Sequence, residues 1–140
     1  MWCKRILLAY DGSAASKNAL KLAVDVAKQD QDIEILAAHI LKVYGAGAAQ
    51  DSIIRQAEAL ADNLEKQLAQ VPNPTRVELL RGDSPADLLL SCAADNECDL
   101  IVMGSRGIGG AKGYLGSVSY AVVQRSEKCA VLIAKEGMHA

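Results

Sequence analysis

The sequence has no uninterrupted apolar run that approaches the ~18 residues needed to span a membrane. Its first residues, Met1 to Arg5, lead directly into a short strand pattern, without the apolar core of a signal peptide. We therefore expect a cytoplasmic protein that has no membrane partner.

An excess of positive charge is also missing. The 15 Lys and Arg residues are scattered along the chain and are outnumbered by 17 Asp and Glu residues, which gives a net charge of −2. Proteins that bind DNA or RNA carry Lys and Arg clustered on one face or helix. We expect no nucleic-acid partner.

The cysteines do not form a metal-binding pattern. The four cysteines are Cys3, Cys92, Cys98 and Cys129; no Cys-x-x-Cys pair occurs, and no histidine is close enough in the sequence to complete a zinc pattern. A free cysteine behaves as a small hydrophobic residue. We expect buried free thiols and no metal held by protein side chains.

Familiar catalytic and nucleotide motifs are missing too. The sequence has no Gly-x-x-x-x-Gly-Lys-Ser/Thr, and no Gly-x-Gly-x-x-Gly follows the first strand. No serine, histidine and carboxylate cluster can be assembled, and His39, which ends an apolar segment, is expected to be structural. The pattern favours ligand binding over catalysis, although slow ATP hydrolysis stays open because it needs little beyond positioning of the triphosphate.

The residues that are present predict one α/β domain over residues 1–140. Apolar residues make up 51% of the chain and charged residues 23%, as in an ordinary globular domain. Short apolar segments alternate with segments of helical periodicity, which predicts a doubly wound parallel sheet with helices on both faces. The expected strands are 5–9, 33–40, 76–80, 99–103 and 130–134, and the expected helices are 13–27, 53–68, 84–96 and 117–127.

Two loops are candidates for a binding site. Asp11 follows the first strand, and a stretch with six glycines, from Gly104 to Gly116, follows the fourth. Ligands of parallel sheets bind beyond the carboxyl ends of the strands, so both loops flank one crevice if these two strands are neighbours. Asp11 could contact the ligand or could only accept hydrogen bonds within its turn.

The glycine-rich stretch suits a phosphate group. Glycines let backbone N–H groups approach an anion, and the helix expected from Ser117 presents the N–H groups of Val118 and Ser119 at its N-terminus. The hydroxyls of Ser117 and Ser119 add donors, and Arg106 and Lys112 could offset phosphate charge. The alternative is a surface loop whose glycines only permit tight turns and helix packing.

Three segments carry a family resemblance. ILLAYDGS at 6–13, MGSRG at 103–107 and GSVS at 116–119 resemble the universal stress protein family, with the elements in the same order over nearly the whole chain. The resemblance implies strand order 3-2-1-4-5, an adenine nucleotide alpha hydrolase-like fold, ATP with Mg²⁺ as the cofactor, and a stress-response or signalling role. The implied ATP-binding residues are Ala9, Asp11, Ile40, Met103, Gly104, Arg106, Gly107, Gly116, Ser117, Val118 and Ser119.

One departure from the family pattern keeps other functions open. Eight residues, 108–115, separate Gly107 from Gly116, where the ATP-binding branch has nine. The alternatives are a stress protein that does not bind ATP and acts through dimerisation and protein contacts, a slow nucleotide hydrolase or transferase, and a binder of AMP or a cyclic nucleotide.

The fifth strand, 130–134, is expected at a sheet edge, where unpaired backbone groups seek a partner. The resemblance implies a homodimer in which this strand pairs with its copy. The alternative is an edge covered by the C-terminal tail, although residues 136–139 are few and mostly polar.

Overall fold

The computed structural model describes residues 1–42, 47–106 and 115–138. Five strands form one parallel sheet in the order β3-β2-β1-β4-β5, which confirms the predicted fold class and strand order. The strands are β1 (Arg5–Ala9), β2 (Glu34–Leu41), β3 (Thr75–Arg81), β4 (Leu100–Gly104) and β5 (Ala130–Ala134), and the helices are α1 (Ala14–Ala27), α2 (Ala48–Leu68), α3 (Pro85–Asp95) and α4 (Ser117–Arg125).

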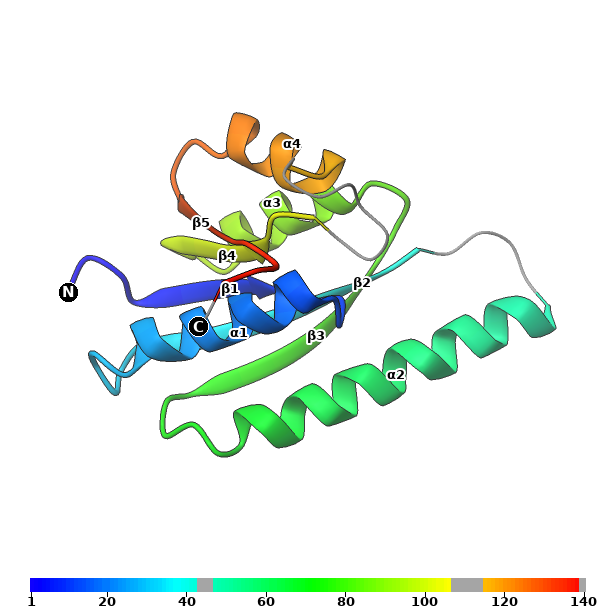
Figure 1. Ribbon diagram of the computed structural model, residues 1–140, viewed down its shortest axis with the longest axis horizontal. Helices are drawn as coiled ribbons and strands as arrows, with labels where there is room; N and C mark the ends of the chain where they lie inside the picture. Colours follow the sequence, from blue (N-terminus) through cyan, green and yellow to red (C-terminus); the bar gives the residue numbers. More distant parts are fainter. Residues whose placement is uncertain (43–46, 107–114, 139–140) are drawn as a thin grey trace.

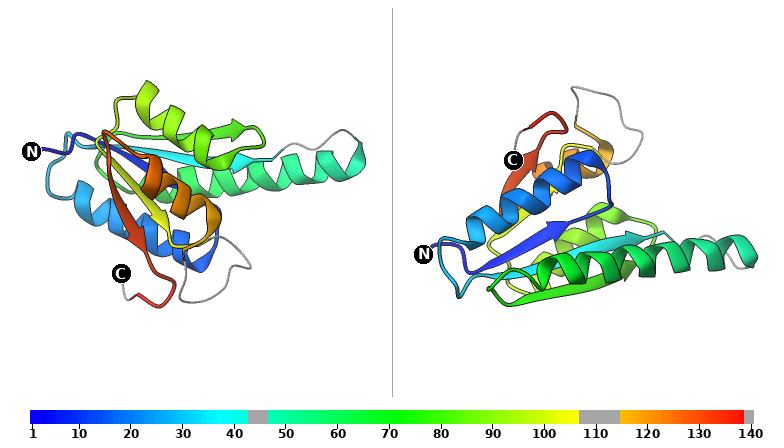
Figure 2. Two further views of the ribbon diagram at one scale, coloured as in Figure 1. Left: turned by 90° about the horizontal axis from the view of Figure 1, so that it is seen from above. Right: turned by 60° about the horizontal axis from the view of Figure 1, so that its bottom comes forward.

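Helices cover both faces of the sheet. Helices α1 and α2 lie on one face and α3 and α4 on the other, as the two orientations in Figure 2 make clear together with Figure 1. This division follows from the strand order, because the chain winds outward from β1 to β3 and then crosses back to β4 on the other side of β1.

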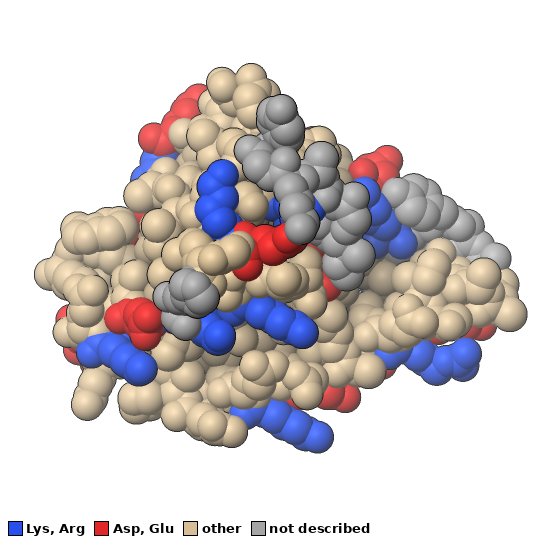
Figure 3. All heavy atoms as spheres, viewed as in Figure 1, with Lys and Arg blue, Asp and Glu red and all other residues tan. Residues whose placement is uncertain are grey.

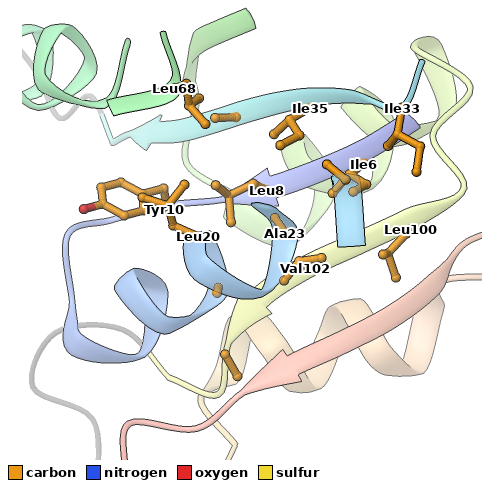
Figure 4. Close-up of a cluster of buried hydrophobic side chains, with 14 of the residues drawn as sticks. Ile6, Leu8, Tyr10, Leu20, Ala23, Ile33, Ile35, Leu68, Leu100 and Val102 are labelled. Atoms are coloured by element: carbon orange, nitrogen blue, oxygen red, sulfur yellow. The ribbon is translucent and has the colours of Figure 1, made fainter. Parts of the chain in front are cut away.

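Alternate side chains of each strand enter different cores. Ile6 and Leu8 of β1 point toward α1 and α2, in the core drawn in Figure 4, where Tyr10 and Leu68 are also labelled. Leu7, between them, packs with the residues of α3 and α4. Burial on both faces explains why these strands are continuous apolar runs.

The ends of the helices follow the predicted signals with one clear difference. Ser13 caps α1 through its side chain, which accepts from the N–H of Ser16, and Pro85 is the first residue of α3. Helix α2 begins at Ala48, five residues before the predicted start at Ile53. The predicted start was wrong because residues 48–52 carry no apolar stripe of helical spacing. Ala48 and Ala49 are nevertheless strong helix formers, which favours the additional turn.

The buried side chain of Asn73 ties two turns together. Its Nδ2 donates to the carbonyl oxygens of Ala27, Asp30 and Ile33, each at 2.9 Å. Asn73 precedes β3, whereas its three partners span the connection from α1 to β2. The bonds therefore fix the amino ends of β2 and β3 relative to each other.

The thiols are free, as predicted. Cys3, Cys92 and Cys98 are buried, and only Cys129 differs from the prediction by being half-buried. Burial raises the pKa of the Cys98 thiol to about 12, with smaller contributions from Cys92, Cys129 and Asp99. Burial likewise raises the pKa of Cys3 to about 11. These thiols stay protonated at neutral pH and are therefore poor nucleophiles.

Charges of both signs are interspersed on the face shown in Figure 3. Among the helices of the described residues, none is both long enough and apolar enough to cross a membrane.

Replacement of Asn73 by alanine should lower the free energy of unfolding by about 1–3 kcal/mol, because three carbonyl groups, two of them in buried bonds, each lose one donor. Urea denaturation followed by circular dichroism measures this loss. Asn63→Ala is the matched control, since Asn63 is exposed on α2, and its effect should stay within about 0.5 kcal/mol. Equal losses in the two variants would contradict the role given to Asn73.

Candidate functional site

A cavity of about 810 Å³ lies at the carboxyl ends of the central strands. Strands β1 and β4 are hydrogen-bonded neighbours, with Leu7 opposite Ile101, so the loops that follow them flank this cavity as predicted. Ten of the eleven predicted site residues line it, and Gly107 lies outside the described residues, as does Lys112. The ten are Ala9, Asp11, Ile40, Met103, Gly104, Arg106, Gly116, Ser117, Val118 and Ser119.

One end of the cavity is apolar. Ala9, Ile40 and Met103 come from the ends of three neighbouring strands, β1, β2 and β4. Leu89 of α3 and Leu60 of α2 close the cavity from the two sides of the sheet. Such a surface suits a flat, weakly polar ring, because burying it requires little desolvation of polar groups.

The loop after β1 is held by its own polar groups. The Asp11 carboxylate accepts from the N–H of Ser13 at 2.9 Å, and Gly12 between them has a φ of +81°, which favours glycine. Asp11 thus makes the turn interaction that the sequence offered as an alternative. The same carboxylate lines the cavity, so its second oxygen can still accept from a ligand.

Gly104 ends β4 where this strand lies against the first turn of α1. A Cβ added at Gly104 would lie 2.7 Å from the Cβ of Ala15 and 3.0 Å from the backbone N of Ser16. Neither neighbour is the end of a flexible side chain, so only glycine fits. Packing alone therefore explains this glycine, and its place in the cavity wall is a consequence.

The N-terminus of α4 opens into the cavity. Gly116 is the residue before the helix, and the first bond of the helix runs from the N–H of Tyr120 to the Gly116 carbonyl at 2.9 Å. The N–H groups of Ser117, Val118 and Ser119 precede that bond and have no acceptor within the helix. They form a compact set of donors with a partial positive charge.

The hydroxyl of Ser119 was predicted to donate to phosphate, but in the structure it donates to backbone carbonyl groups. It lies within 2.5 Å of the Ser105 carbonyl oxygen and 3.1 Å of the Gly116 carbonyl oxygen, and it donates to them. Ser105 also accepts from the N–H of Gly116 at 2.7 Å. The side chain of Ser119 thus joins α4 to the end of β4, and its backbone N–H is the group that a ligand can reach.

Arg106 carries one of the positive charges of the cavity wall. Its guanidinium forms an ion pair with Glu136, in the segment that follows β5. The Arg106 side chain is 8% exposed, so the guanidinium is shielded from water, whereas the Glu136 carboxylate is exposed. The sequence predicted Arg106 as a partner for phosphate but gave no indication of Glu136, which lies 30 residues away.

Several wall residues were missed by sequence reasoning. Helix α2 contributes Ile53, Gln56, Ala57 and Leu60, which only long-range packing brings to the site. His39 also lines the cavity and has the structural role that was predicted for it. Its Nδ1 lies 2.8 Å from the Tyr10 carbonyl oxygen, and because that oxygen can only accept, Nδ1 carries the proton. The remaining wall residues are Tyr10, Ser13, Ser16, Ala38, Leu41, Lys42, Pro85 and Leu89.

The donor set is poor for binding a metal directly. Asp11 is the single carboxylate among the wall residues that the structure describes, and those residues include no cluster of three or more metal-ligating side chains. A magnesium ion would fit here only if ligand phosphates supplied most of its oxygens, as is usual for this ion.

Comparison with known proteins identifies a family that matches nearly the whole chain. The model of the universal stress protein family matches residues 3–135. A universal stress protein from Thermus aquaticus is 33% identical over 137 residues, which cover 94% of this chain and 98% of the relative.

Solved structures share the fold. The universal stress protein UspA from Lactobacillus plantarum has a TM-score of 0.73 at 24% identity and covers 94% of this chain and 97% of its own. A family protein from Arabidopsis thaliana, solved with AMP bound, has a TM-score of 0.70 at 22% identity, covering 94% and 91%. A universal stress protein in complex with cAMP has a TM-score of 0.65 at 26% identity, covering 96% and 98%.

These matches extend over nearly the full length of the chain. The solved structures agree with the five-stranded parallel sheet and its strand order. The chain belongs to the universal stress protein family.

Proposed function

We propose that this protein binds an adenine nucleotide in the cavity at the carboxyl ends of β1, β2 and β4. The observation that carries the proposal is the pairing of two surfaces within one cavity: the apolar strand ends at Ala9, Ile40 and Met103, and the N-terminus of α4 at Ser117. The first suits an adenine ring and the second an anionic phosphate. Two of the structural neighbours were solved with AMP and with cAMP.

Each part of the wall has a role in this proposal. Asp11, beside the strand ends, accepts from the ribose hydroxyls, and the N–H groups of Ser117, Val118 and Ser119 donate to phosphate. Mg²⁺, when bound to a triphosphate, would neutralise phosphate charge, and Asp11 is the residue that could hold it from the protein side. We propose ATP as the physiological ligand and regard AMP and cAMP as competitors to be ranked by titration.

We further propose that the protein acts by binding rather than by turnover, as a stress-response or signalling protein. Among the described wall residues, Asp11 and His39 each already have a structural bond, to the N–H of Ser13 and to the Tyr10 carbonyl. The protein is then a sensor whose surface depends on the bound nucleotide. Slow hydrolysis is measured in the same titration by following released phosphate.

A second candidate is a family member that acts without ATP. The segment between Gly107 and Gly116, one residue shorter than in the ATP-binding branch, favours it. Such a protein would act through dimerisation and protein contacts alone.

Strand β5 supports the proposal of a homodimer. It lies at the edge of the sheet, and the segment that follows it turns toward α1, where the Asn18 side chain binds the Lys135 carbonyl at 2.9 Å. Within β5, Ala130 N donates to Asp99 O at 3.0 Å and Ala134 O accepts from Ser105 N at 2.7 Å.

These bonds define which backbone groups of β5 face outward. Because Ala130 and Ala134 bond toward β4, the N–H and C=O groups of Val131 and Ile133 point away from the sheet. They can pair with the same strand of a second copy.

Gly116→Ala should weaken ATP binding by about tenfold, because the added Cβ would lie 3.2 Å from the Cα of Arg106 and would crowd the donors of α4. Mass spectrometry of nucleotide released from purified protein, followed by calorimetric titration with Mg-ATP, measures the effect. Asn63→Ala is the control, since Asn63 is exposed on α2 and is not among the residues that line the cavity. The absence of both nucleotide and binding heat would favour the ATP-independent candidate.

Ile133→Pro should shift the protein from dimer to monomer, because it removes an outward N–H while leaving the bonds of β5 to β4 in place. Light scattering coupled to size-exclusion chromatography gives the molar mass. Ile133→Ala keeps the N–H and should remain dimeric. A wild-type protein that elutes as a monomer would contradict the proposed dimer.

A further inference from the structure

The ion pair of Arg106 with Glu136 lies at the rim of the nucleotide cavity. Arg106 is part of the wall, whereas Glu136 belongs to the segment 135–138 that follows β5. The side chain of Arg106 is 8% exposed and that of Glu136 is 39% exposed. The contact is therefore more protected from water than an ordinary surface ion pair.

Several bonds place Glu136 beside Arg106. The Nδ2 of Asn18, on α1, donates to the carbonyl oxygens of Lys135 at 2.9 Å, Glu136 at 3.1 Å and Met138 at 3.4 Å. The buried position of Asn18 makes these bonds costly to lose. The bonds from Asn18 and the ion pair with Arg106 thus hold the segment together, one on the side of α1 and the other at the cavity.

Arg106 also adjoins the phosphate donors proposed above. A Cβ built on Gly116 would lie 3.2 Å from the Cα of Arg106 and 3.3 Å from its Cβ. The backbone of Arg106 therefore lies in the same corner of the cavity as the N–H groups of Ser117 to Ser119. A phosphate bound to those groups would lie within reach of a guanidinium on this long, flexible side chain.

Carboxylate and phosphate both match the fork of donors on a guanidinium. When the two acceptors compete for one guanidinium, the interaction of each with it is weaker than it would be without the competitor. Among the described wall residues, the other positive side chain is Lys42, which comes from the end of β2. Of these two wall residues, Arg106 is the one that adjoins Gly116 at the start of α4, and its guanidinium is paired with Glu136.

We propose that Glu136 is an internal competitor of the nucleotide phosphate for Arg106. A nucleotide that carries a phosphate takes the guanidinium from Glu136 and loosens the segment 135–138, whereas adenosine leaves the ion pair intact. Glu136 thereby lowers affinity for phosphate-bearing ligands and couples occupancy of the cavity to the chain that directly follows the edge strand β5. This inference rests on the proposed nucleotide function.

The coupling must work in both directions. If phosphate binding weakens the hold on the segment 135–138, then anything that detaches that segment strengthens phosphate binding by the same factor. A partner that captures the C-terminal segment would therefore raise nucleotide affinity.

The test is a titration of the full-length protein with AMP and with adenosine. Glu136→Gln keeps the size of the side chain and removes its charge, so AMP should bind about three- to tenfold more tightly while adenosine binding is unchanged. Glu127→Gln, which removes the same charge beyond the C-terminal end of α4, should leave both affinities unchanged. Adding Arg106→Gln to Glu136→Gln should abolish the gain for AMP.

Hydrogen exchange supplies a second readout. Saturating AMP should increase exchange in the peptide covering 135–138 of the wild-type protein, and adenosine should not. Wild-type binding of AMP with no gain in Glu136→Gln, an equal gain in Glu127→Gln, or unchanged exchange in that peptide would each overturn this inference and leave the nucleotide function standing. If no variant binds any nucleotide, the proposed function is overturned and this inference with it.

Discussion

The parallel pairing of β1 with β4 is the contact on which the site depends. It joins Ile6 to Leu100 and Leu8 to Val102, two strands separated by more than ninety residues of sequence. At this pair the winding direction of the sheet reverses, so the connections that leave the two strands diverge to opposite faces. A cavity opens between them because no helix crosses the sheet at that position.

The glycines around the cavity therefore have different physical reasons to be there. Gly104 allows β4 to end against Ala15 and Ser16 of α1, and it would be needed in a protein that bound nothing. Gly116 lies against Arg106 and the Ser105 carbonyl, where space next to the α4 donors is limited. In a glycine-rich motif, some glycines are required by packing and others by ligand binding. The sequence does not distinguish the two reasons, but the atoms around each glycine do.

Sequence reasoning was most successful where local patterns determine the structure. The bounds of β1 and β5 were predicted to the residue, since each is a short apolar run bounded by turn signals or charged residues. The wall contributed by α2 could not be foreseen, because Ile53 and Gln56 reach the cavity only through long-range packing. The bond of the Ser119 hydroxyl to Ser105 and the pairing of Arg106 with Glu136 were hidden for the same reason.

The central claim is that an adenine nucleotide occupies the cavity with its phosphate at the N-terminus of α4. Amide chemical-shift mapping by nuclear magnetic resonance during an AMP titration tests it most directly. The account predicts the largest shifts at Ser117 to Ser119 and at Asp11 to Ser13, with small shifts around Asn96 at the opposite end of the sheet. Shifts centred on that opposite end, or none at saturating AMP, would contradict it.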